Sequence, residues 1–585
     1  MKKLISIVLC LCLLFSLVAC GNAPVSSPKV ESTVEPTSES TPELTPEPLI
    51  DKAALALDLS EAQWEKSADG TYYQLLDVHF CTNVLAEKYQ TMNIYVPAEY
   101  FEGGEVCGYT AETAPIVLMN NCSGWRSGSA GNADKTMIEN GFVFVNCGAR
   151  SRGAGDNGEG KAPAPVVDLK SALRTLRLNS DVIPGDEEKI ISIGTSGGGE
   201  MSSILGASGN MEEYYSYLYE NGAPGLLYDE ANDTYISTIN DDVYGCMCYC
   251  PIADIENADL AYAWWRYGCG DTGFAGMFGG NADFTEFQIA LERDLAVAFC
   301  EYINSLGIMN EEGESLGFDV TSADKEMAVS NPRIGSFYEQ ILENMSDSLN
   351  AFIAGNTDAE GSFSYTKSAG RGHRGPGGPG GSETTTYDSL EAYLASLGNT
   401  SEWLVKNEDG TYSVTDMAGF LAGTALSRNK DIPGFDTFDL SAENNAFGTA
   451  DEEAVHYSAS VAAVLEANYE RYSQLEGFEA AAVDAYIEQA NREDLAQQTY
   501  LMNATAIMLD TAAGEQDADF ADHWRTRNGT ADEHTSFSVA YNLAMSALMA
   551  GAESVDYALV WAMHHGSDEG TSTGTFTEWV HSICG

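Results

Sequence analysis

The segment Gly194-Thr195-Ser196-Gly197-Gly198-Gly199 constrains the fold of this chain more than any other short stretch. It follows a short apolar run at residues 189–193 and precedes a run with helical spacing at residues 200–205. Glycines on both sides of a serine allow the backbone to turn sharply, so that a strand, a tight turn and a helix present the hydroxyl at a helix N-terminus. We therefore predict that Ser196 is a nucleophile, with an ordinary glycine-rich turn as the alternative.

The chain around this turn has the pattern of a mostly parallel β-sheet flanked by helices. A helical pattern covers residues 166–178, and a last helix is predicted at residues 576–583. Short apolar runs typical of buried strands occur at residues 92–96, 115–119, 141–145, 189–193, 243–249 and 557–561. Short strands that alternate with amphipathic helices predict the α/β class, with helices on both faces of the sheet.

The length of 585 residues exceeds what one hydrophobic core usually serves, so either two domains or one enzyme fold with a large insertion is expected. Residues 260–520 interrupt the α/β pattern with a helix-rich stretch. We interpret this stretch as a lid insertion that covers a substrate pocket. The core then consists of residues 70–259 and 521–585.

The N-terminus has the features of an export signal. Met1, Lys2 and Lys3 precede a short apolar run at residues 4–17, which predicts a signal peptide over residues 1–19. The sequence before Cys20 resembles a bacterial lipobox, in which the cysteine receives lipid. Residues 20–48 are rich in Pro, Ser, Thr and Glu and predict a disordered tether. We expect a lipid-anchored protein at the bacterial cell surface, on the outer face of the cytoplasmic membrane.

The charge balance limits the classes of binding partner that this chain can have. The chain has 29 Lys and Arg against 88 Asp and Glu, a formal net charge of −59. Phosphate backbones require clustered cations, so nucleic acid is excluded as a partner class. The acidity otherwise indicates a solvated surface and no particular chemistry. The oligomeric state stays open.

The cysteines give no metal signature. Cys246, Cys248 and Cys250 alternate as on one face of a strand, without paired Cys-x-x-Cys sets and without histidine partners in the sequence. We predict that they are small, buried, apolar residues, and we expect neither a metal nor a cofactor.

A serine nucleophile needs a histidine as base and an acid that orients the histidine. In α/β-hydrolases these residues follow in the order serine, acid, histidine. Among the eight histidines, only the adjacent His564 and His565 fit that order after a strand, and we favour His565. Asp532 ends a probable strand that begins near His523, which makes it the expected acid.

Oxyanion donors are expected from the backbone N–H of Gly197 and from the loop after residues 115–119. That loop reads Asn120-Asn121-Cys122-Ser123-Gly124-Trp125. A small residue lets the backbone approach a substrate closely, so Gly124 is the preferred second donor, with Ser123 next and an ordinary turn as the alternative.

Several motifs together resemble bacterial tannase-type esterases of the α/β-hydrolase superfamily. They occur in order at residues 160–170, 194–199, 250–259, 430–436, 443–448 and 529–532. The resemblance implies an α/β-hydrolase fold, a Ser196, His565 and Asp532 triad, and a lid that binds galloyl hydroxyls through Lys430 and Glu443.

Two positions depart from the resembling family. His534 stands where that family has a second acid that helps to hold the galloyl hydroxyls, so His534 is expected at the substrate. Gly197 stands where alanine is usual. The leading hypothesis is a serine esterase that acts on small aromatic esters. The alternatives are a general carboxylesterase or peptidase of the same superfamily, and a substrate-binding lipoprotein without catalysis.

Overall fold

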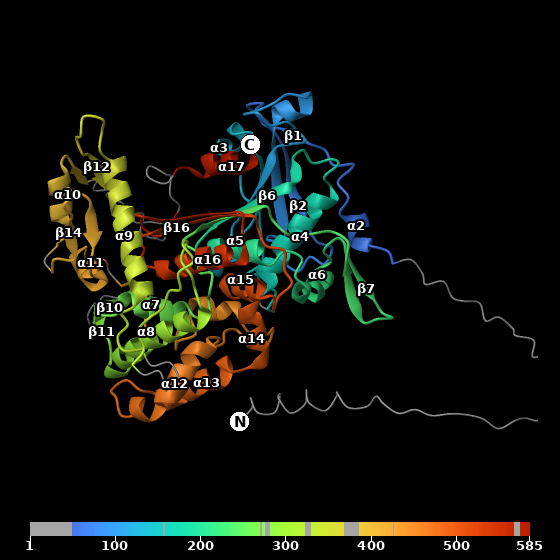
Figure 1. Cartoon of the computed structure of the whole chain (residues 1–585). Coiled ribbons are helices and arrows are strands. Elements are labelled where there is room, and N and C mark those ends of the chain that lie inside the picture. Colours follow the sequence, from blue (N-terminus) through green and yellow to red (C-terminus); the bar gives the residue numbers. More distant parts are fainter. Residues whose placement is uncertain are drawn as a thin grey trace, which may run out of the picture. The chain divides into compact units, whose positions relative to one another are not determined.

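A nine-stranded β-sheet forms the centre of the protein in the computed structural model (Figure 1). The model describes residues 49–585 except 156–157, 269–271, 275–280, 322–328, 368–384, 400, 425, 427 and 567–573. The strands, in spatial order, are β1 Glu65–Lys66, β2 Tyr72–His79, β3 Thr91–Pro97, β5 Val143–Cys147, β4 Pro115–Asn120, β6 Asp186–Thr195, β9 Gly245–Tyr249, β16 His523–Gly529 and β17 Ser554–Val560.

Within this sheet the strands β5, β4, β6, β9, β16 and β17 are parallel to one another. Strands β1, β2 and β3 pair antiparallel and form one side of the sheet, where β3 is also antiparallel to β5. Each apolar run that predicted a strand overlaps one of these strands, so the α/β class is confirmed. Strands β5 and β9 are buried along their whole length, on both faces of the sheet. This burial explains why they read as continuous apolar runs without alternation.

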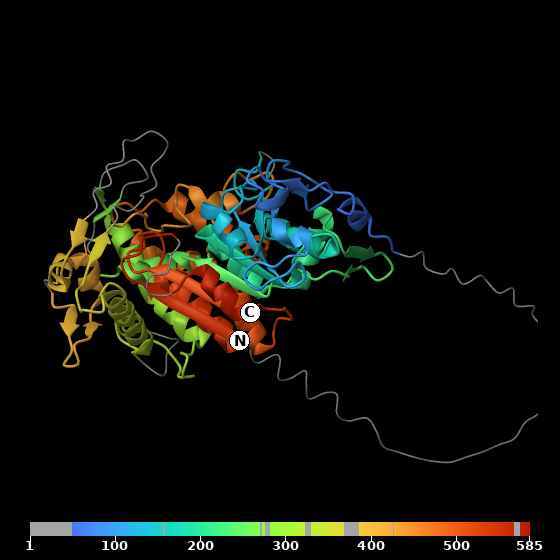
Figure 2. The same cartoon turned by 90° about the horizontal axis from the view of Figure 1, so that it is seen from above.

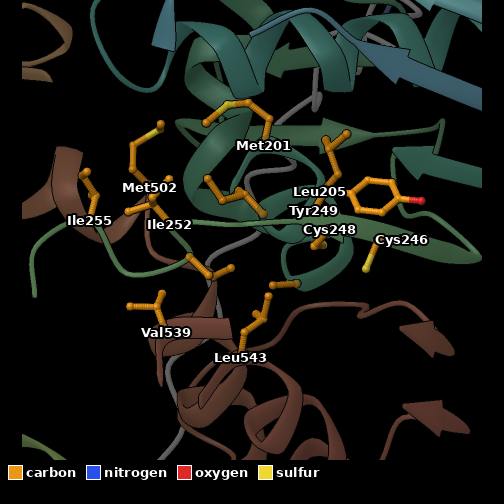
Figure 3. Packing of buried hydrophobic residues seen from close by; sticks show 14 of the residues in the cluster. Met201, Leu205, Cys246, Cys248, Tyr249, Ile252, Ile255, Met502, Val539 and Leu543 are labelled. Atoms are coloured by element: carbon orange, nitrogen blue, oxygen red, sulfur yellow. The ribbon is translucent and has the colours of Figure 1, made fainter. Parts of the chain in front are cut away.

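Helices cover both faces of the sheet. On one face lie α4 Ala164–Leu178, α5 Gly197–Ala207 and α16 Phe537–Ala550, and on the other lies α17 Phe576–Cys584. Strand β9 shows the division, because a Cβ on Gly245 would meet Trp579 of α17, whereas a Cβ on Gly206 of α5 would meet Cys246. Figure 3 shows the face that α5 covers, where Met201 and Leu205 of α5 lie near Cys246 and Cys248.

Cys246 and Cys248 of β9 are buried and form no disulfide bond, as predicted for small apolar residues. Cys250 departs from the expected alternation, because the backbone turns there to a φ of 45° just after the strand ends. Its thiol reaches the loop after β17, where Sγ lies 3.3 Å from the carbonyl oxygen of Gly566.

Residues 250–522 leave the end of β9 and return to the start of β16, the neighbouring strand. Their main elements are α7 Ala258–Arg266, α8 Glu286–Leu306, α9 Ser336–Gly355, β12 Tyr365–Lys367, β13 Thr385–Tyr387, α10 Leu390–Ser396, α11 Met417–Gly423, η5 Ala442–Ala446, α12 Ala459–Tyr472, α13 Ala480–Ala490, α14 Glu493–Tyr500 and α15 Ala504–Ala513. Figures 1 and 2 both show the yellow part around α9 on the β17 side of the sheet, away from the blue antiparallel strands. α15 instead packs against α5 and α16 and so belongs to the layer that covers the sheet.

The N-terminal features lie outside the described residues. These are the predicted signal peptide, Cys20 and the tether over residues 20–48. Within the described part of the chain, no helix combines the length and the apolar character that a membrane span requires.

Buried ion pairs fix α4 to the chain that leads into β9. Asp241 is completely buried and lies 2.7 Å from Lys170 Nζ and 2.6 Å from the Arg174 guanidinium. Burial by itself would raise the pKa of Asp241, but the two cations lower it below its ordinary value. The carboxylate is therefore ionised and neutralises two cations that have no access to water.

Replacing Asp241→Ala should lower the free energy of unfolding by about 3–5 kcal/mol, because two buried cations would lose their counter-charge. Urea unfolding followed by circular dichroism measures the change. Asp181→Ala, at an exposed position after the same helix, is the control and should change stability by less than about 0.5 kcal/mol. A loss below 1 kcal/mol for Asp241→Ala would contradict the assignment.

Candidate active site

Ser196 occupies a strained turn between β6 and α5. Its φ of 63° and ψ of −125° are rare for a residue with a side chain. The turn depends on close backbone packing, since a Cβ on Gly194 would lie 2.1 Å from the carbonyl oxygen of Gly198. The Ser196 N–H donates to the Tyr249 carbonyl at the end of β9, at 2.9 Å. This is the geometry that presents a nucleophilic hydroxyl above the carboxyl edge of a parallel sheet.

The two predicted oxyanion donors lie side by side. The loop after β4 continues as η3 Ser123–Trp125, and Gly124 has a φ of 66°. A Cβ on Gly197 would lie 3.2 Å from the Gly124 nitrogen and 2.7 Å from the Trp125 nitrogen. The backbone nitrogens of the loop therefore lie close to Gly197, as the donors of an oxyanion hole would.

Side chains hold this loop in place. Ser123 Oγ donates to the Thr195 carbonyl at 3.1 Å, so Ser123 ties the loop to the elbow through its side chain. Asn120 Nδ2 donates to the Gly198 carbonyl at 2.9 Å. Arg152 Nε donates to the Gly124 carbonyl at 2.8 Å. These bonds fix the loop with respect to the elbow.

Asp532 and His565 form a hydrogen-bonded pair at the ends of β16 and β17. Nδ1 of His565 lies 2.8 Å from Oδ2 of Asp532, and the ring N–H donates because an ionised carboxylate only accepts. The Asp532 side chain is fully buried. Burial raises its pKa, but the charge and hydrogen bond of His565 outweigh burial and lower the pKa below the ordinary value. The carboxylate can therefore orient the imidazole and stabilise its protonated form.

His564 takes a different place from its neighbour. It lines a cavity beside Trp561, whereas His565 contacts Asp532. The loops that carry the acid and the base are locked together, because the Ala531 N–H donates to the Met563 carbonyl at 3.0 Å.

Cys250 connects the serine turn to the acid–base pair. It follows Tyr249, which accepts the Ser196 N–H, and its Sγ lies within 4.8 Å of ligand atoms of both Asp532 and His565. No hydrogen bond joins Ser196 to His565 among the residues that the model describes. Such bonds are often loose in unliganded enzymes and tighten when the substrate binds.

The Cys250, Asp532 and His565 set is also the only group in the described part of the chain with the spacing of a metal site. Burial and the charge of Asp532 raise the pKa of the Cys250 thiol well above its ordinary value. Metals bind thiolates, and a thiol that resists ionisation is a poor ligand. The set therefore fits an acid–base pair better than a metal site.

Lys430 and Glu443 of the insertion lie next to each other beside the oxyanion loop. Lys430 Nζ is 3.7 Å from Glu443 Oε1 and 3.7 Å from the ring centre of Phe435. Phe435 meets the Trp125 ring edge-on at 6.5 Å, and η5, which contains Glu443, contacts η3. Oε2 of Glu443 is buried without a hydrogen-bond partner among the described residues.

Asp259 holds the segment that carries Lys430 in place through backbone hydrogen bonds. Its carboxylate accepts N–H bonds from Gly434, Phe435 and Asp436 at 2.5–2.9 Å. Burial raises the pKa of Asp259 to about 6, although the three backbone donors oppose the shift. These bonds join the segments at residues 250–259 and 430–436.

His534 also lies at the site. Its ring centre is 4.7 Å from that of His565, and Asn429 Nδ2 lies 3.1 Å from its Nε2. The backbone N–H of His534 donates to Asp532 Oδ1 at 2.8 Å. The structure thus brings the acid, both rings and the insertion together.

Glu200 is a residue that the sequence analysis missed. It lies in the first turn of α5, completely buried, and its Oε2 accepts a hydrogen bond from Trp125 Nε1. Its Oε1 has no partner among the described residues. Burial, with repulsion from Glu443 and Asp254, raises the pKa of Glu200 well above its ordinary value despite the bond from Trp125. A glutamate within an otherwise apolar and small-residue run was the available signal.

The chain is similar to a known protein family and to several solved structures. A family model described as BD-FAE matches residues 107–244. A sequence search of curated proteins gave no match.

Several solved structures are similar over most of their length. A tannase from Lactobacillus plantarum is 26% identical, with a TM-score of 0.66 and coverage of 89% of this chain and 98% of that one. Fusobacterium nucleatum tannase is 24% identical, with a TM-score of 0.67 and coverage of 90% and 99%. A tannin acyl hydrolase in complex with ethyl gallate is 24% identical, with a TM-score of 0.66 and coverage of 89% and 97%.

Replacing Glu200→Gln should stabilise the protein more at pH 8 than at pH 5. Because burial raises the pKa of Glu200, its carboxyl holds a proton more strongly in the folded protein than in the unfolded chain. Unfolding then releases a proton from Glu200, so the contribution of this carboxyl to the free energy of unfolding falls as the pH rises. We expect the melting temperature to rise by at least about 2 °C at pH 8 and by less at pH 5.

Glu212→Gln in η4 Glu212–Tyr214 is the control, since Glu212 is exposed. Thermal unfolding at both pH values compares the two variants. An equal shift for Glu200→Gln at pH 5 and pH 8 would show that its carboxyl is ionised in the folded protein.

Proposed function

We propose that this chain, a tannase-type α/β-hydrolase, is a serine esterase that cleaves esters of phenolic acids, with galloyl or a related hydroxybenzoyl or cinnamoyl group as the acid part. The observation that carries the proposal is the buried Asp532–His565 pair at the strand edge that also carries the strained turn of Ser196. A surface aspartate beside a histidine is common, but these two residues share an edge with a serine elbow and paired backbone donors.

In the proposed reaction, Ser196 Oγ attacks the ester carbonyl carbon while Nε2 of His565 takes the hydroxyl proton. The N–H groups of Gly197 and Gly124 stabilise the negative oxygen of the tetrahedral intermediate. The intermediate collapses to an acyl-enzyme, and the alcohol leaves with the proton from His565. Water, deprotonated by His565, then attacks the acyl-enzyme, and the acid is released as Ser196 regains its proton.

The pair of Lys430 and Glu443 supports a phenolic acyl group. Glu443 Oε2 is a buried acceptor that lacks a donor within the described residues, and a phenolic hydroxyl would supply one. Lys430 offers donors beside it. The similar hydrolase with bound ethyl gallate has a ligand of this class.

His534 separates this proposal from a strict gallate esterase. An imidazole replaces one carboxylate acceptor, so that fewer acceptors face a trihydroxylated ring. We therefore propose that the acid part extends beyond galloyl to rings with fewer hydroxyls.

The cellular location is proposed from the sequence. The signal-like residues 1–19, Cys20 and the acidic tether favour export and a lipid anchor, which would hold the esterase at the outer face of the cytoplasmic membrane.

Ser196→Ala and His565→Ala should each lower kcat/KM on methyl gallate or methyl ferulate by about 10⁴-fold or more, because the residues of a triad act as a unit. His79→Ala, on the distant strand β2, is the matched control and should retain the wild-type rate. Release of the phenolic acid, measured by chromatography, reports the rate.

Cleavage of p-nitrophenyl acetate distinguishes the alternatives. If the wild type hydrolyses only this acetate, the protein is a general carboxylesterase. Equally poor hydrolysis of all three esters by the wild type and Ser196→Ala would favour a binding protein without catalysis.

Gly197→Ala should lower kcat by roughly tenfold, a partial loss compared with removal of a whole oxyanion donor. The added methyl group would lie 2.7 Å from the Trp125 nitrogen and 3.0 Å from the Cys122 carbonyl oxygen, so the loop would have to move. This close approach explains why glycine stands at this position. Steady-state kinetics with a melting curve for each protein separates loss of rate from loss of fold, and an unchanged kcat would contradict the assigned donor geometry.

A further inference from the structure

An aromatic cavity of about 240 Å³ is bounded on one side by the loops that carry Asp532 and His565. Two of its walls belong to those loops, because Thr530 and Ala531 precede the acid and Ala562 and His564 precede the base. Its other walls come from the insertion. They consist mainly of the aromatic side chains of Tyr365, Tyr387, Tyr393 and Phe420, together with Trp561 at the end of β17.

We propose that this cavity, called here the aromatic subsite, binds an aromatic ring in the alcohol part of the ester substrate. The proposal rests on the esterase function proposed above. It implies that the preferred substrates have two rings, one in the acid part and one in the alcohol part.

The walls are arranged for a flat ligand. Tyr365 and Tyr387 face each other across the β12–β13 pair, with ring centres 6.4 Å apart and planes 7° from parallel. Tyr393 meets both rings nearly edge-on. The Tyr393 hydroxyl accepts a hydrogen bond from Trp561 Nε1 at 2.7 Å. This bond fixes the Tyr393 and Trp561 rings relative to each other. Edge-to-face and offset contacts with such walls favour an aromatic ring over an alkyl chain.

The volume suits one ring. A dry cavity of about 150 Å³ is enough to hold benzene, so about 240 Å³ holds a substituted ring but not two. Glu533 and His564 provide polar groups along the same wall. A mostly apolar cavity with a few polar groups is typical of a small-molecule site, and these groups suit a ring with a hydroxyl substituent.

The position of the cavity selects the alcohol part. His565 gives its proton to the departing alcohol, so that part of the ester must lie on the histidine side of Ser196. The loops are held together by the bond from the Ala562 N–H to Thr530 Oγ1 at 3.0 Å. Successive Cα atoms are 3.8 Å apart, so a ring against His564 lies within roughly 10 Å of His565. A two-carbon linker between the ester oxygen and the ring spans roughly 4 Å and so covers part of that distance.

The test compares the methyl and 2-(4-hydroxyphenyl)ethyl esters of the same phenolic acid. The wild-type enzyme should favour the two-ring ester in kcat/KM by at least tenfold. Ser396→Trp places a large side chain at the exposed rim of the aromatic subsite and should reduce that ratio to near one. Ser473→Trp, exposed at the end of α12, is the control and should keep the wild-type ratio.

Calorimetry with the free alcohol 2-(4-hydroxyphenyl)ethanol tests the subsite without turnover. It should bind the wild-type protein and bind Ser396→Trp at least tenfold more weakly. A wild-type ratio near one, or equal affinity for both proteins, would overturn the proposal. If the wild type cleaves neither ester, the esterase function fails, and the calorimetry still decides whether the cavity binds the ring.

Discussion

The parallel pairing of β6, β9, β16 and β17 is the constraint on which the candidate site depends. These strands come from chain segments that are far apart, yet their register brings Thr195, Tyr249, Gly529 and Val560 to one edge of the sheet. The serine turn, the thiol, the acid and the base each follow one of these strand ends. Any shift in the register would separate the groups that the proposed chemistry needs together.

Much of the fold could be predicted because most of the parallel strands are short apolar runs that local sequence reveals, although β16 is buried and largely polar. The serine turn was equally visible, since its glycines are required by approaches as close as that of Gly194 to Gly198. The required order of serine, acid and histidine limited the search for the base to two adjacent residues. Periodicity could not separate His564 from His565, because their environments differ only through the distant residues that pack around them.

Other features could not be predicted from the sequence because they depend on contacts between segments that are far apart in the chain. The antiparallel edge of β1, β2 and β3 has no local signal that distinguishes it from the parallel strands. Glu200 resembles any first-turn helix acid until Trp125 is placed over it. The aromatic subsite combines residues from β12, β13, α10, α11 and the loops after β16 and β17. Lys430 and Glu443 were found through a family resemblance, and the structure brings them to the same side of the oxyanion loop.

The raised pKa of Glu200 has an electrostatic consequence for the helix that begins at the nucleophile. The N-terminus of an α-helix carries roughly half a positive charge, which favours an anion next to it. An ionised carboxylate in the first turn of α5 would cancel most of this potential at the place where the negative oxygen forms. Burial raises the pKa of Glu200 and so favours the neutral carboxyl, which accepts the hydrogen bond of Trp125 with less competing charge. A chain with three times as many acidic as basic residues thus places a completely buried glutamate in the helix turn after the serine, where burial favours the uncharged form.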